Sequence, residues 1–117
     1  MSNWIDLCET AFTALGLPYD FEQMTCDTSQ LPDAYIVYFL VDDTGEGYSD
    51  GTETSHQPRI QVSLYYRDKS TVLTIPEQII SALTEVGFTR GAAGRIPYQA
   101  DTGHYGWRCD FYHYERC

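Results

Sequence analysis

The most informative part of the chain is the run Ala34-Tyr35-Ile36-Val37-Tyr38-Phe39-Leu40-Val41. Most of its residues are β-branched or aromatic, it is too short for a typical helix, and the sequence Asp-Asp-Thr-Gly follows it. These features predict a strand that is apolar on both faces. A second strand is predicted over residues 59–67, where a more polar row alternates with the apolar residues Ile60, Val62, Leu64 and Tyr66.

One helix is predicted before this pair of strands in the sequence and another after it. Apolar residues at helical spacing indicate a helix from about Asn3 to Leu15, which Gly16 and Pro18 would end. The sequence Thr74-Ile75-Pro76-Glu77 has the form of a capping box with a proline in the first turn, and an apolar stripe follows it as far as Gly87. It predicts the start of the second helix.

The remaining segments predict two more strands and a connection. Residues 88–96 and 104–114 have strand patterns, whereas residues 18–33 read as a connection with a short strand near Phe21. The resulting order α, β, β, α, β, β predicts an α+β fold, with a four-stranded, mainly antiparallel sheet and two helices on one face.

Length and composition limit the class of protein. The 117 residues suffice for one domain over residues 1–117, and 43% hydrophobic residues are too many for intrinsic disorder. No apolar run is long enough to cross a bilayer, and the first residues lack a secretory pattern, so we expect a reducing compartment. The net charge of −10 argues against tight binding to nucleic acid or to an anionic membrane. The four cysteines have no metal-site spacing and are interpreted as free thiols, with two disulfides as the alternative for a secreted protein.

An acidic hairpin loop is predicted at about residues 42–56, between the first two strands. Its expected contact residues are Asp42, Asp43, Glu46, Tyr48, Asp50 and Glu53. The acids come close to the spacing of a calcium-binding loop, but that motif joins two helices and this segment joins two strands. We therefore expect no metal here, and interpret the loop as mobile and solvated, or as ordering against a partner.

Groups that could support catalysis do not converge in the sequence. His104 and His113 are separated by an odd number of residues, which places them on opposite faces of a strand. Cys109 lies between Trp107 and Phe111 on the inward row, where an apolar setting makes a thiol inert. We expect no catalytic residues, no metal and no cofactor.

One row of the predicted sheet has no helix to cover it. Aromatic residues are enriched in the centres of interfaces, so this row predicts contact with a partner or a second copy of the chain. The expected interface residues are Tyr35, Val37, Phe39, Val41, Tyr112 and Tyr114. The alternative is that residues 18–33 fold over the face.

The order of these pieces resembles a known family. It is carried by the run from Leu31 to Phe39, a loop with Tyr48-Ser49-Asp50-Gly51, the strand Ile60 to Tyr66, the helix that begins at Pro76-Glu77, and Asp101-Thr102-Gly103-His104-Tyr105 before an aromatic last strand. Over about residues 3–115 the chain is similar to the small tail-completion proteins of long-tailed bacteriophages and prophages, which comprise tail terminators and tail-to-head joining proteins.

The resemblance implies a structural role. Members of this family assemble as rings, usually hexamers, on the end of the tail tube, and then present a surface to the head connector. It implies a virion location at the head-proximal end of the tail, assembly in the bacterial cytoplasm, DNA that passes through the lumen without tight binding, and no membrane. Terminator and head-side connector both remain open. The competing hypotheses are a small acidic binding module or inhibitor that mimics nucleic acid, and an enzyme.

Overall fold

Strands β2 (Ala34–Glu46) and β3 (Ser55–Tyr66) form the antiparallel centre of the fold. In this computed structural model, which describes residues 4–22, 31–46, 55–113 and 115–116, their register runs from Ala34 opposite Tyr66 to Glu46 opposite Ser55, with one irregularity between Leu40 and Asp42. The pairing extends well past the apolar run, because a β-ladder is held by backbone groups that every residue supplies.

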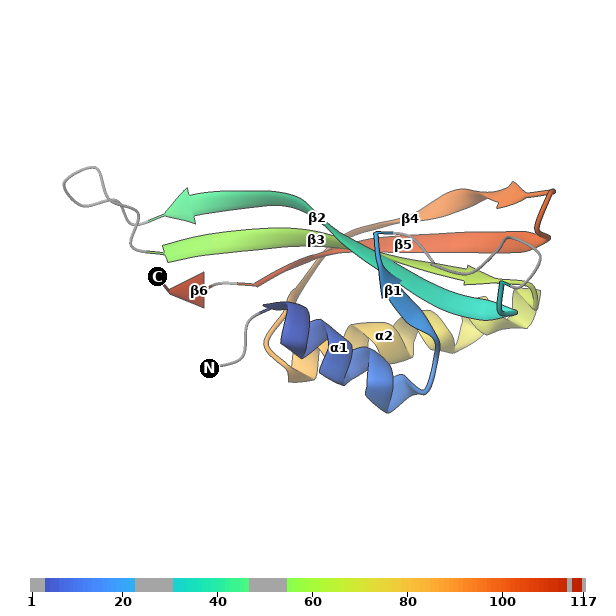
Figure 1. Cartoon of the computed structure of the whole chain (residues 1–117), viewed down its shortest axis with the longest axis horizontal. Coiled ribbons are helices and arrows are strands. Elements are labelled where there is room, and N and C mark those ends of the chain that lie inside the picture. The colour runs from blue at the N-terminus through green and yellow to red at the C-terminus, as the bar shows by residue number, and fades with distance from the viewer. Residues whose placement is uncertain (1–3, 23–30, 47–54, 114, 117) are drawn as a thin grey trace.

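The other strands add to this pair on both sides (Figure 1). β1 (Tyr19–Phe21) lies parallel to β2, and β5 (His104–Tyr112) lies antiparallel to β3. β4 (Thr89–Gln99) pairs with β5, and β6 (Glu115–Arg116) pairs with the start of β3. The order across the sheet is β1-β2-β3-β5-β4, so β1 and β4 are its two edges.

Helices α1 (Trp4–Leu15) and α2 (Ile75–Glu85) pack on the same face of the sheet (Figure 1). The core lies between the two layers and contains Cys8, Ala11 and Phe12 of α1, Ile79 and Leu83 of α2, Ile36 and Tyr38 of β2, Ile60, Val62, Leu64 and Tyr66 of β3, Phe88, and Cys109 and Phe111 of β5. Each helix ends at a glycine with positive φ, Gly16 at 75° and Gly87 at 103°. After α2, Phe88 N–H donates to Leu83 C=O and Gly87 N–H to Thr84 C=O, which is a Schellman ending.

The start of α2 differs from the sequence prediction. A short 3-10 helix, η2 (Lys69–Leu73), precedes it and is capped by Asp68, whose carboxylate accepts from Ser70 N–H. Pro76 lies in the first turn of α2 as predicted, but the Thr74 side chain makes no capping hydrogen bond. The capping-box prediction is therefore wrong, since the chain enters α2 from a helical turn and not from an extended segment.

The α+β class and the two helices on one face are confirmed, but the sheet is larger than predicted. The short strand near Phe21 is present as β1, and its parallel pairing with β2 makes the sheet mixed, although the other pairings between strands are antiparallel. The predicted loop at 42–56 is also too long, because residues 42–46 and 55–56 belong to strands. Residues 47–54 lie outside the described part of the chain.

Gly106 of β5 marks a close approach between strands. A Cβ atom at this position would lie 2.5 Å from Ile96 Cβ and 3.0 Å from Ile96 Cγ2 on β4. We expect Gly106→Ala to lower the free energy of unfolding by about 1–3 kcal/mol, because the two strands must move apart. Urea denaturation measures this loss.

Gly94→Ala provides the matched control for this prediction. A Cβ at Gly94 would meet Arg108 Nη2 at 3.0 Å, at the end of a flexible side chain that can move. The loss there should stay below about 1 kcal/mol, and equal losses in the two variants would show that the approach of Ile96 is not the cause.

Candidate interaction surfaces

Four of the expected interface residues, Tyr35, Val37, Phe39 and Tyr112, lie on the face of the sheet opposite the helices, but they differ in exposure. Tyr35 is 6% and Val37 is 8% exposed, so both are buried within the chain. Phe39 and Tyr112 are half-buried, and Val41 is 43% exposed. Tyr114 lies outside the described residues. The premise that nothing covers this row is therefore wrong for Tyr35 and Val37.

Tyr35 is buried in an aromatic group that the sequence pattern did not reveal. Its ring stacks on Tyr65 at a centroid distance of 5.1 Å and meets His104 edge-on at 5.2 Å. His104 is fully buried, and its Nε2 donates to the carbonyl of Pro32 across 2.8 Å. His113 instead packs against Phe88 with ring centroids 4.9 Å apart. The two histidines lie on opposite faces as predicted, and each serves packing in the contacts described here.

An ion pair on the same open face holds β3 against β5. Arg59 Nη2 lies 2.6 Å from Asp110 Oδ2, and Arg59 Nε donates to the same oxygen at 3.2 Å. The Asp110 side chain is 4% exposed and that of Arg59 is 42% exposed. The Arg59 guanidinium also lies 5.9 Å from the ring centroid of Tyr112. Arg59 and Tyr112 form the last row in which β3 and β5 pair, and Asp110 lies two rows further in, opposite Gln61.

Beyond the last row shared by β3 and β5, β2 and β3 continue as an arm, which we define as residues 42–46 and 55–58. Within the described residues, β6 pairs with this part of β3 at Ser55 and His56, and at the base of the arm Pro58 C=O accepts from His113 N–H. Figure 1 shows the arm projecting past the ends of both helices, and the molecule measures 52 × 24 × 24 Å. The predicted contact residues Asp42, Asp43 and Glu46 lie on the arm, whereas Tyr48, Asp50 and Glu53 lie outside the described residues.

Three of the groups with shifted pKa values, Cys8, Tyr38 and Cys109, belong to the core. Burial, with a smaller contribution from Glu9, raises the pKa of the Cys8 thiol far above its ordinary value. Burial also raises the pKa of Cys109, and it raises that of Tyr38, whose hydroxyl donates to Glu9 Oε2 at 3.0 Å. Cys8 and Cys109 are free thiols as predicted, and Cys26 and Cys117 lie outside the described residues. In the described ranges no group of three or more His, Cys, Asp and Glu side chains could hold a metal ion.

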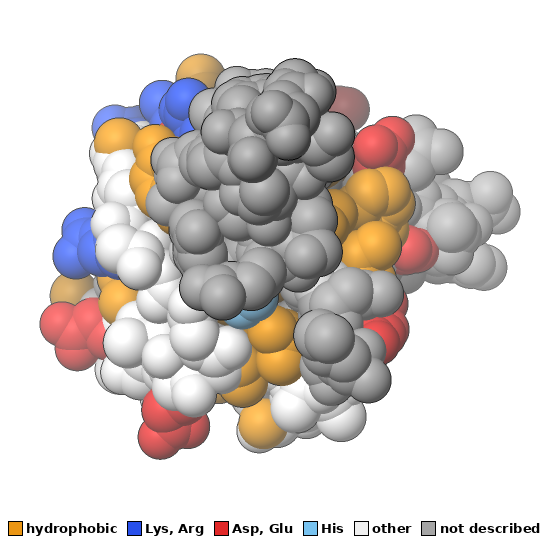
Figure 2. All heavy atoms as spheres, turned by 90° about the vertical axis from the view of Figure 1, so that its left-hand side faces the viewer, with side chains coloured by type: hydrophobic (Ala, Val, Ile, Leu, Met, Phe, Trp, Pro, Cys, Tyr) orange, Lys and Arg blue, Asp and Glu red, His pale blue; other side chains and the backbone are white. Residues whose placement is uncertain are grey.

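Charge is divided unequally along the chain. Residues 1–58 contain no Lys or Arg, whereas all 7 basic residues fall within residues 59–117. In the end view of Figure 2 the visible Lys and Arg side chains gather on the left, and most of the Asp and Glu side chains lie on the right or below. A groove of ≈ 650 Å³ on the acidic side is lined by Asp6, Glu9, Thr10, Thr13 and Tyr19.

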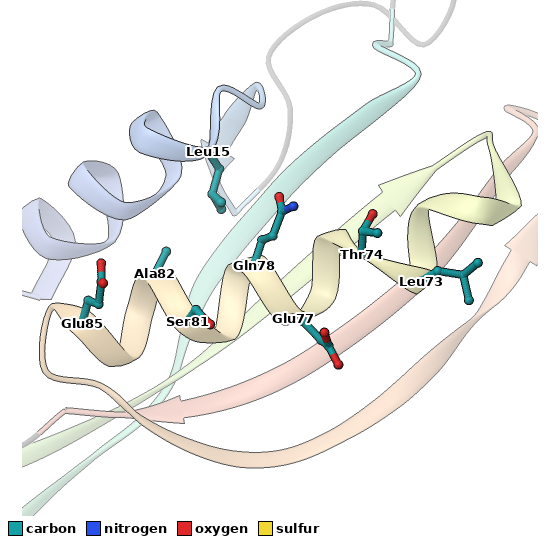
Figure 3. Close-up of a pocket in the computed structure, with 8 residues that line it drawn as sticks. All are labelled: Leu15, Leu73, Thr74, Glu77, Gln78, Ser81, Ala82 and Glu85. Atoms are coloured by element: carbon teal, nitrogen blue, oxygen red, sulfur yellow. The ribbon is translucent and has the colours of Figure 1, made fainter.

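Two further hollows lie on the helix side of the molecule. One, of ≈ 490 Å³, runs from Leu73 at the end of η2 along α2 to Glu85, and reaches Leu15 of α1 (Figure 3). Its lining mixes Glu77, Gln78 and Ser81 with small or apolar residues and contains no basic group. The other hollow is ≈ 430 Å³ and apolar except for Arg95 at its rim. It is lined by Tyr66, Val72, Ala93, Gly94, Gly106 and Trp107.

Sequence reasoning did not predict this apolar hollow, because its lining comes from four separate elements. It also did not single out Phe21, which remains 40% exposed although it packs on Trp4 and Tyr38. The available signal was the local sequence, in which Phe21 stands between Asp20 and Glu22. An aromatic residue between two acids on a strand is unusual for a position that serves only the core.

No protein-family model matches the chain, and comparison with curated proteins finds no match either. Among the described residues, no helix has the length and apolar character needed to cross a membrane.

The Arg59–Asp110 pair yields a stability prediction. We expect Arg59→Met to lower the free energy of unfolding by about 1–3 kcal/mol, because it leaves the buried Asp110 carboxylate without its cation. Adding Asp110→Asn should restore part of the loss, since the buried group then carries no charge. Chemical denaturation of the single and double variants measures both effects.

Arg67→Met is the control for this experiment. Arg67 Nη1 pairs with Asp33 Oδ1 at 2.8 Å, but the Asp33 side chain is 85% exposed. Solvent screens such a pair, so we expect a loss below about 1 kcal/mol. Similar losses for Arg59→Met and Arg67→Met would contradict the role given to burial.

Proposed function

We propose that the chain is a structural virion protein that caps the end of a phage tail tube as a ring and joins the tail to the head connector. The observation that carries the proposal is the arm, residues 42–46 and 55–58. It extends a single-domain body by two paired strands that β4 and β5 do not accompany. Such an arm can reach a neighbouring subunit or a second ring while the body stays in its own ring.

The arm also has a chemical character suited to this role. Asp42, Asp43 and Glu46 follow one another closely on β2, and no basic residue precedes Arg59 in the chain. Acidic arms of separate copies repel one another in solution. The arm therefore binds a basic surface of a partner more favourably than it binds the arm of another copy. The same negative charge keeps DNA from adhering where it passes.

The acidic groove on α1 supports one alternative. Its Asp6 and Glu9 carboxylates lie beside the Thr10 and Thr13 hydroxyls, a set that suits a lysine or arginine from another protein. The chain would then be an acidic binding module or an inhibitor that mimics nucleic acid. Tail terminator and head-side joining protein remain two versions of the main proposal.

The test is complementation in a long-tailed phage genome that lacks its tail-completion gene, followed by electron microscopy of the particles. We expect the chain to restore tails of uniform length joined to heads. The arm variant Asp43→Asn/Glu46→Gln should reduce joined particles at least about tenfold, because it removes the charges that guide docking.

The matched control is Glu77→Gln/Glu85→Gln, which removes the same amount of charge from the exposed face of α2. It should leave joining unchanged. If the chain is folded and the particles still lack joined tails, the tail-completion role is wrong. Retention by a column of basic protein, lost in Asp6→Asn/Glu9→Gln, would then identify the chain as an acidic binding module.

A further inference from the structure

We infer that copies of this chain associate head to tail, with the β1 edge of one copy paired against the β4 edge of the next. The inference deepens the proposed ring by naming its seam. Within the described residues no strand pairs with the outer side of β1 or of β4. Unpaired edges are templates for another strand, and here the molecule has one on each side (Figure 1).

The two edges lie at the same level of the sheet. The register places Tyr19, Ile36, Leu64, Trp107 and Arg95 in one row that crosses all five strands. The next row runs from Asp20 to Gly94, and the third from Phe21 to Ala93. A second copy moved sideways across the strands therefore brings its β1 against residues 93–95 of β4.

The strands also match in direction and length. β1 is parallel to β2, and three successive antiparallel pairings separate β2 from β4, so β1 and β4 run in opposite directions. The junction is therefore antiparallel. Register shifts between Arg90 and Ala93 and between Ile96 and Gln99 leave a short regular stretch on β4, and β1 has 3 residues. These features protect the edges from indiscriminate pairing and confine a new pairing to this short stretch.

The backbone of β1 presents the groups this pairing needs. Pro18 C=O accepts from Ile36 N–H, and Glu22 N–H donates to Tyr38 C=O, so the even-numbered residues face β2. By alternation Tyr19 and Phe21 direct their backbone groups outward. Asp20 Oδ1 accepts from Phe21 N–H at 2.9 Å, which leaves the N–H of Tyr19 and the carbonyls of Tyr19 and Phe21 for the neighbouring β4.

Side chains on the helix face are complementary across the same junction. Phe21 is a half-exposed aromatic residue on this face, because it lies opposite the core residue Tyr38 and packs on its ring at 5.3 Å. The apolar hollow beside β4 is on the same face, since Trp107 and Tyr66 line it. Sideways association places Phe21 of one copy at the hollow of the next, where Val72 and Trp107 can cover its ring.

Charge favours the same pairing. The β1 edge carries Asp20 and the exposed Glu22, whereas the β4 edge carries the exposed Arg90 and Arg95. On the open face the guanidinium of Arg108 lies over Gly94, in the row that continues to Asp20. Pairing of two β1 edges, or of two β4 edges, would bring charges of the same sign together. The contact is therefore between the β1 edge of one copy and the β4 edge of another. Such a contact closes into a ring or continues as a filament, according to the rotation between copies.

The experiment uses two variants of the full chain, each with one blocked edge. Phe21→Ala removes the aromatic side chain of the β1 edge, and Val72→Glu places a carboxylate in the hollow beside β4. Sedimentation velocity from about 1 µM to about 1 mM should show association of the unmodified chain. The dissociation constant should be at least about tenfold higher in each variant. An equal mixture of the two variants should form dimers and nothing larger, because one intact edge of each kind remains.

Leu73→Glu is the matched control, since Leu73 is the next residue, is 74% exposed and lines the other hollow. It should associate like the unmodified chain. Should Phe21→Ala fail to fold by circular dichroism, Glu22→Lys replaces it in the mixture. Three results would each overturn the inference. The unmodified chain could stay monomeric at about 1 mM, Val72→Glu and Leu73→Glu could weaken association equally, or the mixture of variants could form no dimer.

The complementation assay separates this result from that of the proposed function. Association through these edges by a chain that restores no tails supports the seam and contradicts the tail role. Restoration of tails by Val72→Glu at the unmodified level contradicts the seam alone.

Discussion

The antiparallel ladder between β2 and β3 is the constraint on which the rest of the structure depends. β1 can pair only because β2 has a free side, and β5 and β6 both pair with β3. One face of the ladder supplies Ile36, Tyr38, Ile60, Val62 and Leu64, the apolar surface on which both helices pack. Because this ladder is longer than the layer of helices, the same element that organises the core also forms the arm.

The parts of the fold that the sequence predicted are those with a local signal. Both helices have a repeating apolar stripe, and residues 59–67 and 104–112 alternate cleanly. β1 and the extension of β2 to Glu46 depend on backbone pairing with a distant segment, which leaves little trace in three or four side chains. The capping of α2 was mispredicted for a related reason. The chain enters α2 from the helical turn η2, and the four-residue capping pattern does not reveal that turn.

The candidate surfaces were harder to predict than the fold. Tyr35 and Val37 were expected to be uncovered, but the ring of Tyr65 and the anchored His104 take part in packing on that face. Strand parity gives the side of a sheet and cannot give what lies above it. The hollow beside β4 and the position of Phe21 depend on cross-strand rows through five strands, information that no local pattern contains. The absence of Lys and Arg from residues 1–58 was the one feature of the sequence that indicated an acidic side and a basic side of the molecule.

The core protects its two buried cysteines, Cys8 and Cys109, from oxidants. The thiolate is the form of cysteine that attacks peroxides and disulfides, and burial favours the protonated form of Cys8 and Cys109. Neither sulfur can therefore start along the path from sulfenic to sulfonic acid without local unfolding of the core. While the chain stays folded, these two thiols should therefore remain reduced in an oxidising solution, and the core keeps its packing there.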